Sequence, residues 1–507
     1  MRRRVIVIAG ALLAAAAGAV VCTVASRPPA LEGARAVARR AHIRPDYANL
    51  VIPPNIAPLN FRVLEDGRRY VVRISGAGGE PVEIDSSSPR ISIPLGDWRK
   101  LLQANRGGRV RFEIFVQGGA GQWSRFAPIP NDVAEEPIDG YLVYRLIRAL
   151  FNVYSRVDIH ERDLTTFEER VVVNGRAMDR SCVNCHTFRD HKTADMLVHV
   201  RGRRGVAMLL GRGGRLAKVE TRTKYNPSPA AYTCWHPSGR FVTFSVNKLR
   251  MFYHELGEAR DVFDAASDLG CYWPASNALK SSRHLTDPDQ LETFPNWSPD
   301  GRYLYFCRAP RTPFRRYRQI RYDLMRIRYD LDADTWGLPE VVLSAKETGR
   351  SAAEPRVSPD GRYVMFCLFD YGSFPVYQPS SDLYLMDLQG GGWRKLSVNS
   401  ARSESWHCWS SNGRWFVFAS KRRDGLFAKP YLSYFDRTGR AHKPFVLPQR
   451  DPDFYESSLR TYNVPELVSQ PVPLRPRDFA RAVLAPSDAR SAEAISGATA
   501  RPRAGAN

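Results

Sequence analysis

The chain has 507 residues, more than a single hydrophobic core usually supports, so we expect two or three domains. Its 74 Lys and Arg residues against 52 Asp and Glu residues give a net charge of +22, which attracts anionic partners. The arginines are scattered through turns and tails, and the part expected to fold has no compact basic run. The composition therefore argues against nucleic-acid binding, and it does not name another partner.

The N-terminus has the features of an export signal. Three arginines at positions 2–4 precede the uncharged segment Val5–Ala25, which is long enough to span a bilayer. Thr23–Ala25 ends this segment with small residues, as a cleavage site would. Residues 1–26 are thus predicted to be either a cleaved signal peptide or an inner-membrane anchor formed by residues 5–25. Both alternatives place the rest of the chain in the periplasm or elsewhere outside the cytoplasm.

Residues 27–45 are rich in Ala, Arg and Pro and are predicted to be a linker. A small β-sandwich domain is predicted over residues 46–137, because short apolar runs alternate there with Gly-rich turns. The predicted strands are Tyr70–Ile74, Val82–Ile84, Ile91–Ile93 and Val110–Val116.

A helix is predicted between Ile138 and Tyr154, at the start of a connecting segment, residues 138–193. Apolar residues recur here at the spacing of one helix face: Leu142, Leu146, Ile147, Leu150, Phe151 and Tyr154.

Four copies of one element follow. They read WHPSGRF from Trp235, WSPDGRY from Trp297, VSPDGRY from Val357 and WSSNGRW from Trp409, at intervals of 62, 60 and 52 residues. Each is a turn followed by an apolar strand: Pro presets φ, Asp or Asn bonds the nearby backbone, and Gly accepts a positive φ. A second shared hairpin, seen at Asp382–Asp387, completes four strands per period.

These repeats resemble the TolB-type β-propeller repeat, in which Ser-Pro-Asp-Gly-Arg between two strands marks each blade. The resemblance covers residues 194–450 and implies a mainly β chain with a TolB-like propeller of five or six blades over residues 194–470. Gly211–Gly214 would be the turn of a first, degenerate blade, and Tyr462–Leu467 would contribute to a sixth. The tail, residues 471–507, is predicted to be disordered because it is rich in Arg, Ala, Ser and Pro.

The segment that carries chemistry is Ser181–His186, with the sequence Ser-Cys-Val-Asn-Cys-His. Cys-x-x-Cys-His is the attachment sequence of c-type haem: two thiols at this spacing form thioethers with the two vinyl groups of one haem, and the adjacent histidine binds the iron. A disulfide or half of a zinc site would need a βαβ context or a second Cys or His pair, neither of which we find. The motif predicts one covalent haem c, held by Cys182 and Cys185 with His186 as axial iron ligand. The resemblance to a c-type cytochrome is confined to this motif.

The second axial ligand of the haem iron is left open by the sequence. His199 is the first candidate and Met196 the second, and a strand through both would place them on opposite faces. His191 and a residue from the propeller are further candidates, and a five-coordinate iron is the remaining alternative. A Met ligand would raise the reduction potential, whereas an open site would admit small molecules or peroxide.

The other cysteines and histidines carry less information. Cys307 and Cys367 occupy equivalent strand positions and are expected to be small buried free thiols. His236 is expected to cap its turn, and His254 and His407 are expected to be packed or solvated rather than to line the propeller mouth. We find no catalytic triad, phosphate loop or paired-carboxylate signature.

Three functions are compatible with these features. The first is an electron carrier or redox protein of the cell envelope, whose propeller docks a redox partner. The second is a haem oxidoreductase or peroxidase. The third is a propeller that binds an envelope protein, with the haem as a structural or sensing group.

Overall fold

The computed structural model describes most of the chain: residues 31–148, 157–202, 205–221, 230–251, 262–485, 490–491 and 493–494. The predicted signal peptide or anchor lies outside these ranges. Within them, no helix is both long enough and apolar enough to cross a membrane.

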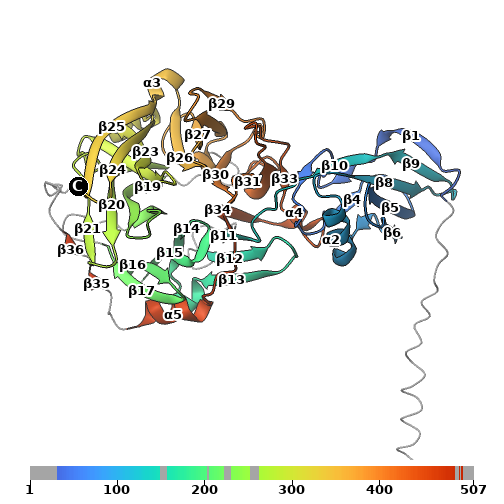
Figure 1. Cartoon of the computed structure of the whole chain (residues 1–507), viewed down its shortest axis with the longest axis horizontal. Coiled ribbons are helices and arrows are strands. Elements are labelled where there is room, and N and C mark those ends of the chain that lie inside the picture. The colour runs from blue at the N-terminus through green and yellow to red at the C-terminus, as the bar shows by residue number, and fades with distance from the viewer. Residues whose placement is uncertain are drawn as a thin grey trace, which may run out of the picture.

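An N-terminal β domain lies beside the rest of the molecule (Figure 1). Its elements are β1 (Arg35–Arg40), β2 (Ile43–Arg44), β3 (Val51–Ile52), β4 (Phe61–Val63), β5 (Arg69–Gly76), β6 (Val82–Ser86), β7 (Arg90–Ile91), α2 (Leu95–Ala104), β8 (Arg109–Gln117), β9 (Trp123–Ala127) and β10 (Ile129–Val133). Strands β2, β4 and β7 form a small sheet, and the other strands form a larger one. The sheets share a core in which Phe61 of β4 stacks on Phe112 of β8, with 5.9 Å between ring centroids. The four strands predicted in this domain are confirmed as β5 to β8.

The predicted linker over residues 27–45 is wrong where the structure describes it. Strand β1 pairs in parallel with β9, and β2 pairs with β4. The side chains of β1 are almost all exposed, so the strand depends on backbone hydrogen bonds at a sheet edge and needs no apolar alternation.

The predicted helix from Ile138 is also wrong over its described residues, because Tyr141–Arg148 form strand β11. Strand β11 has a neighbour on each side, β12 and β34. Leu142, Val143 and Tyr144 are consecutive and fully buried, so both faces of this strand are covered. An apolar segment of this kind can be mistaken for a helix face, since its periodicity alone does not separate the two. Residues 149–154 lie outside the described ranges.

The rest of the described chain builds six sheets of four or five strands each. The first three contain β11 (Tyr141–Arg148), β12 (Asp158–Asp163), β13 (Glu169–Asn174), β14 (Cys182–Arg189), β15 (Lys192–Gly202), β16 (Gly205–Arg212), β17 (Arg215–Glu220), β18 (Ala230–Trp235), β19 (Val242–Met251), β20 (Val262–Trp273) and β21 (Ala278–Lys280). The next three contain β22 (Gln290–Trp297), β23 (Tyr303–Pro310), β24 (Asp323–Asp330), β25 (Thr335–Leu343), β26 (Ser351–Val357), β27 (Tyr363–Phe369), β28 (Asp382–Asp387), β29 (Trp393–Lys395), β30 (Glu404–Trp409), β31 (Trp415–Ser420), β32 (Lys429–Tyr434) and β33 (Phe445–Val446). Late in the chain come β34 (Arg460–Val468), β35 (Arg490–Ser491) and β36 (Glu493–Ala494), and the short helices are η2 (Arg176–Met178), η3 (Phe314–Gln319), α3 (Ala345–Thr348), η4 (Pro375–Tyr377), α4 (Phe454–Ser457) and α5 (Pro476–Leu484).

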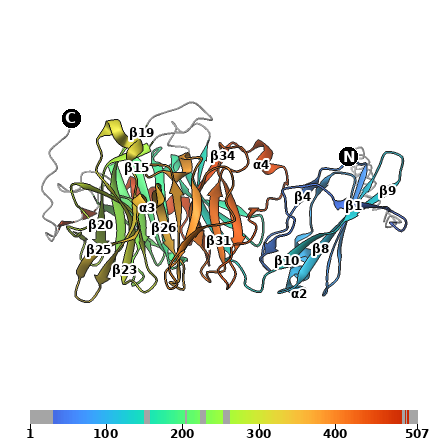
Figure 2. The same ribbon diagram turned by 90° about the horizontal axis from the view of Figure 1, so that it is seen from above.

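The sheets follow one another around a ring in chain order, and seen from above they stand side by side (Figures 1 and 2). The order β13-β12-β11-β34 defines the closing sheet, in which the late strand β34 joins three early strands. We call the next sheet, β14-β15-β16-β17-β35, the motif sheet, because the Cys-x-x-Cys-His sequence lies on it. A late strand paired with early ones fastens the two ends of the ring together.

The repeated turn is confirmed as the link between the first two strands of a sheet. Gly239, Gly301, Gly361 and Gly413 all have a positive φ there, and Ser298 Oγ bonds Asp300 Oδ1 at 2.6 Å. His236 caps its turn through Ser238, as expected.

The turn predicted at Gly211–Gly214 is placed differently. It joins β16 to β17, the third and fourth strands of the motif sheet. The equivalent of the repeated turn is at Asp190 and His191, which adopt a positive φ without any glycine. The missing glycine explains why the sequence did not reveal this turn.

The predicted disorder of residues 471–507 is wrong for helix α5. Its Phe479 and Val483 lie four residues apart, on one helix face, and are buried in a core shared with the closing and motif sheets. The backbone N–H of Arg475 donates to Asp478 at 2.9 Å, and Pro476 occupies the first helical position. Residues 495–507 lie outside the described ranges.

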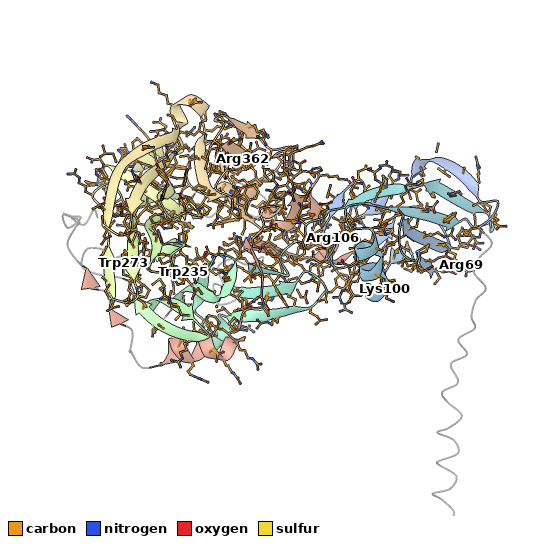
Figure 3. All side chains as sticks on the ribbon, viewed as in Figure 1. Arg69, Lys100, Arg106, Trp235, Trp273 and Arg362 are labelled. Atoms are coloured by element: carbon orange, nitrogen blue, oxygen red, sulfur yellow. The ribbon has the colours of Figure 1, made fainter. Side chains whose placement is uncertain are left out.

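Basic side chains project from the N-terminal domain, where Figure 3 labels Arg69, Lys100 and Arg106. The Lys100 side chain is 85% exposed, and Arg69 forms an ion pair with Asp85. Figure 3 also places Trp235 and Trp273 in the third sheet of the ring. Part of the chain's positive charge therefore lies on the outer surface of the N-terminal domain.

The N-terminal domain packs on the sheet that holds β30 to β33. The Trp415 indole is fully buried and donates to the backbone oxygen of Glu136 at 2.9 Å. Asp139 accepts from the backbone N–H and the hydroxyl of Ser411 at 2.8 and 2.5 Å. The two parts of the molecule therefore share one continuous core.

This contact leads to a stability prediction for Asp139→Ala. The substitution removes both hydrogen bonds that the buried Asp139 carboxylate accepts from Ser411, so we expect the free energy of unfolding to fall by about 1–3 kcal/mol. Asp132→Ala, at a half-exposed ion pair with Arg109, is the control and should change it little. Urea unfolding of both variants measures the difference, and equal losses would contradict the role given to Asp139.

Candidate functional site

The Cys-x-x-Cys-His motif begins strand β14, at one edge of the motif sheet. It is therefore part of the propeller. The prediction that it belongs to a connecting segment, residues 138–193, ahead of a propeller that starts at residue 194, is wrong. The closing and motif sheets lack the Ser-Pro-Asp-Gly-Arg turn by which the other sheets were recognised, so the start of the ring was placed too late.

Cys185 and His186 face a small cavity where the sheets converge. The residues that line this axial cavity come from one strand of each sheet, β14, β18, β22, β26, β30 and β34: Cys185, His186, Tyr232, Thr233, Phe294, Pro295, Glu354, Pro355, Arg356, Trp406 and Val464. A space enclosed by all six sheets lies on the ring axis. Its free volume is about 20 Å³, enough for about one water molecule.

The lining strands share a local distortion at the cavity. Strands β14, β18, β22, β26 and β30 each contain a bulge beside the cavity, which shifts the register of the strand against the next strand of its sheet. Five residues there have a positive φ although none is glycine: Tyr232, Phe294, Glu354, Trp406 and Val464. Such backbone is uncommon for these residue types and concentrates at functional sites. In β14 the bulge falls at Asn184 and Cys185, so the motif occupies the corresponding position in the ring.

His186 is the most unusual residue of the motif. Its side chain is buried, and neither ring nitrogen makes a hydrogen bond of good geometry, although an interaction with the backbone of Val143 acts to raise its pKa. Burial, reinforced by the positive charge of Arg145, lowers its pKa to about 3. The imidazole is therefore neutral, which is the form that binds metal ions. A buried polar group without a well-formed hydrogen bond requires an explanation, and a role as a metal ligand is one.

Both cysteines of the motif are free thiols. Cys185 is buried at the cavity, whereas Cys182 pairs with Arg201 of β15 and does not line the cavity. Burial raises the pKa of the Cys182 thiol, and the guanidinium groups of Arg145 and Arg201 oppose that rise. The donor set of two thiols and a neutral histidine fits a covalently attached haem.

The free space on the ring axis fits a haem less well than the donor atoms do. Aromatic rings fill it: Tyr232 lies 4.4 Å from Phe294 and 6.0 Å from Trp406, and Phe374 packs at 6.2 Å from Tyr232. These four residues form the axial aromatic cluster. A porphyrin is far larger than one water molecule, so the cluster must move for a haem to lie beside Cys185 and His186. Flat aromatic side chains also pack favourably against a planar ring system.

Comparisons with known proteins found only distant structural similarity. No family model and no curated protein matches the chain. TolB from Acinetobacter baumannii is 13% identical over 71% of this chain and 78% of its own, with a TM-score of 0.42. The Dos1 propeller is 14% identical over 53% of this chain and 63% of its own, with a TM-score of 0.34. A chain of the nidogen–laminin complex is 8% identical over 66% of this chain and all of its own, with a TM-score of 0.37.

This chain is mainly β and contains a β-propeller. Because the TM-scores are below 0.5, that assignment rests on the order of the sheets around the ring.

His199, the first candidate for the second iron ligand, lies on the wrong face of the sheet. The register pairs His186 with Val198, so these two side chains share a face and His199 points to the other. His199 is buried without a hydrogen-bond partner, and burial lowers its pKa to about 3. Because His186 and His199 face opposite sides of one sheet, they do not flank a common site. The predicted pairing of these two histidines is therefore wrong.

Met196 and His191 do not complete the site either. Met196 is on the same face as His186, but it pairs with Phe188 and is buried in the apolar core between the closing and motif sheets. His191 lies in the turn between β14 and β15, where its Nδ1 is 3.0 Å from the backbone oxygen of Leu467. The cavity lining contains neither a methionine nor a second histidine.

The cavity also contains residues that sequence reasoning missed. Glu354 is buried with its Oε1 unpartnered, and burial raises its pKa to about 7 against the opposing effect of the Trp406 N–H and of Arg356. The sequence did contain a signal for residues that face the axis. In each repeat, one cavity residue lies five positions before the second residue of the turn: Tyr232, Phe294, Glu354 and Trp406. Aligning the repeats would have shown that this position faces the axis.

Proposed function

We propose that this chain is an exported c-type haem protein that transfers electrons in the periplasm or elsewhere outside the cytoplasm. Cys182 and Cys185 would hold the haem covalently, and His186 would bind its iron. The observation that carries the proposal is His186: it is buried, neutral and without a well-formed hydrogen bond, one position after a free thiol at the axial cavity. When bound, a haem would supply one-electron chemistry at this cavity.

We further propose that the six sheets are the blades of a six-bladed TolB-like propeller, closed by β34, and that the N-terminal domain is a β-sandwich. The pairing of β34 with β11 and the lining of the cavity by all six sheets support this interpretation. A haem near the axis would be shielded on its sides by the blades. Only the end of the ring would then present it to a partner.

The partner of an electron carrier would be a redox protein of the envelope. Since the net charge of +22 favours an anionic surface, we propose an acidic partner. Export would depend on residues 1–26, whether they are cleaved or retained as an anchor.

A second function, a haem oxidoreductase or peroxidase, is favoured by one observation. The cavity holds Glu354 and Arg356 but no second histidine or methionine. A carboxyl with a pKa of about 7 can accept and return a proton at neutral pH, and a guanidinium can stabilise a developing negative charge. An iron without a strong second ligand would leave room for a substrate.

The optical spectrum of the purified protein separates these functions and tests the ligand. We expect His186→Ala to shift the main haem absorption band and to lower the haem content, because it removes the iron ligand. His199→Ala is the matched control, since this histidine is equally buried but faces away, and its spectrum should equal that of the unmodified protein. A spectrum changed by His199→Ala and not by His186→Ala would overturn the assignment. Insensitivity to carbon monoxide supports the electron carrier, whereas carbon monoxide binding with peroxide turnover supports the enzyme.

A further inference from the structure

A second cluster of ligand-type side chains lies beside the axial cavity and does not depend on the haem. Glu354 of β26, Cys367 of β27 and His407 of β30 place a carboxylate oxygen, a thiol sulfur and a ring nitrogen within 4.8 Å of one another. All three side chains are more than nine-tenths buried. They come from two adjacent sheets and therefore meet only in the folded ring.

The distances within the cluster suit a tetrahedral metal ion. Cys367 Sγ is 3.6 Å from Glu354 Oε2 and 3.9 Å from His407 Nδ1. Around zinc, bonds of about 2.3 Å to sulfur and about 2.0 Å to nitrogen or oxygen, at tetrahedral angles, place the ligand atoms about 3.5 Å apart. The 3.6 Å distance also suits a thiol hydrogen bond to Glu354, so metal binding would exchange that hydrogen bond for a bond from sulfur to the metal.

The surrounding groups orient the ligands as the outer contacts of a metal site do. His407 Nε2 is 3.0 Å from the backbone oxygen of Met365, so Nε2 carries the proton and Nδ1 presents its lone pair to Cys367. The backbone N–H of Trp406 donates to Glu354 Oε2 at 2.5 Å. Glu354 Oε1 has no partner at all. Two ligands are thus held in place, and one buried oxygen is left without a bond.

The charges of the ligands and the ion also balance. A thiolate and a carboxylate carry two negative charges, which one divalent cation neutralises, and His407 offers its Nδ1 lone pair while Nε2 donates to Met365. The guanidinium of Arg356 adds one positive charge beside Glu354. A neutral assembly avoids the cost of an uncompensated buried charge. Mixed sulfur, nitrogen and oxygen ligands favour zinc over the hard cations calcium and magnesium.

We propose that Glu354, Cys367 and His407 bind one zinc ion, a structural site that clamps two neighbouring blades together. Binding displaces the Cys367 thiol proton to solvent. Glu354 also lines the axial cavity, which has room for about one water molecule as a fourth ligand.

The test measures zinc in the exported full-length protein after treatment with EDTA and reloading with zinc chloride. We expect one zinc per chain by elemental mass spectrometry and one sulfur neighbour of zinc by X-ray absorption at the zinc edge. Cys367→Ser should lose that sulfur signal and weaken zinc binding at least tenfold. His407→Gln should also weaken zinc binding at least tenfold, but it should keep the sulfur signal. The matched control is Cys271→Ser, because Cys271 is a comparably buried thiol on β20, in a sheet that contributes no ligand, and should keep full zinc binding.

Two results would overturn the proposal. One is a wild-type protein that binds no zinc, or binds it without a sulfur neighbour. The other is zinc binding by Cys367→Ser equal to that of Cys271→Ser. If Cys367→Ser does not fold, the X-ray absorption spectrum of the wild-type protein and the zinc binding of His407→Gln still test the proposal. Haem content is measured separately as iron, so failure here leaves the haem assignment untouched.

Discussion

Replacing Cys182 and Cys185 together by serine is expected to give a folded protein without covalently bound haem. Serine is close to cysteine in size but cannot form a thioether. The pairing of β14 with β15 uses the backbone, so the strand should survive the change. A haem stain on a denaturing gel and the intact mass of the unfolded chain measure the result, which we expect to be complete loss.

The control for this experiment is Cys234→Ser with Cys408→Ser. Both of these thiols lie on lining strands, at the bulge position that His186 occupies in β14, but neither is part of a Cys-x-x-Cys-His sequence. This variant should keep its haem. Covalent haem that persists in the Cys182 and Cys185 double variant would show that another part of the chain attaches it.

Truncation after residue 459, which removes β34, is expected to prevent stable folding. The closing sheet would lose its fourth strand and expose the whole edge of β11. It would also lose four buried apolar side chains, those of Tyr462, Val464, Leu467 and Val468. Each contributes about 1.5–3 kcal/mol, so the loss is on the order of 10 kcal/mol, comparable with the whole stability of a typical domain.

Two shorter truncations separate ring closure from the loss of the tail. Ending the chain after residue 485 keeps β34 and α5 and should leave the melting temperature nearly unchanged. Ending it after residue 475 removes α5, with Phe479 and Val483, and should lower the melting temperature without preventing folding. A protein that folds normally without β34 would contradict closure of the ring by this strand.

The part of the fold that could be predicted from the sequence was the part specified by residues that lie close together along the chain. The turns at Trp297 and Val357 combine Pro, Asp and Gly in fixed order, and the strands after them follow as expected. The turn at Asp190 reaches the same geometry without these residues, so the first strand of the motif sheet was assigned to a connecting segment. Strand β11 was mistaken for a helix because burial on both faces comes from its neighbours and not from its own pattern.

The residues of the Cys-x-x-Cys-His motif could be predicted from the sequence, but the side chains around the motif could not. Strand alternation correctly separated Met196 from His199, but only the pairing with β14 shows which of them shares the face of His186. The axial aromatic cluster and the group of Glu354, Cys367 and His407 each unite side chains from different sheets. Residue spacing along the chain does not predict contacts between different sheets, because these contacts depend on how the blades close around the axis.

The intact mass of the exported wild-type protein, measured under denaturing conditions together with its absorption spectrum, tests the central claim most directly. The account predicts the mass of the chain plus one haem, with the added mass on the peptide that contains Cys182 and Cys185, and the absorption bands of a c-type haem. An unmodified mass with both thiols open to alkylation would contradict it.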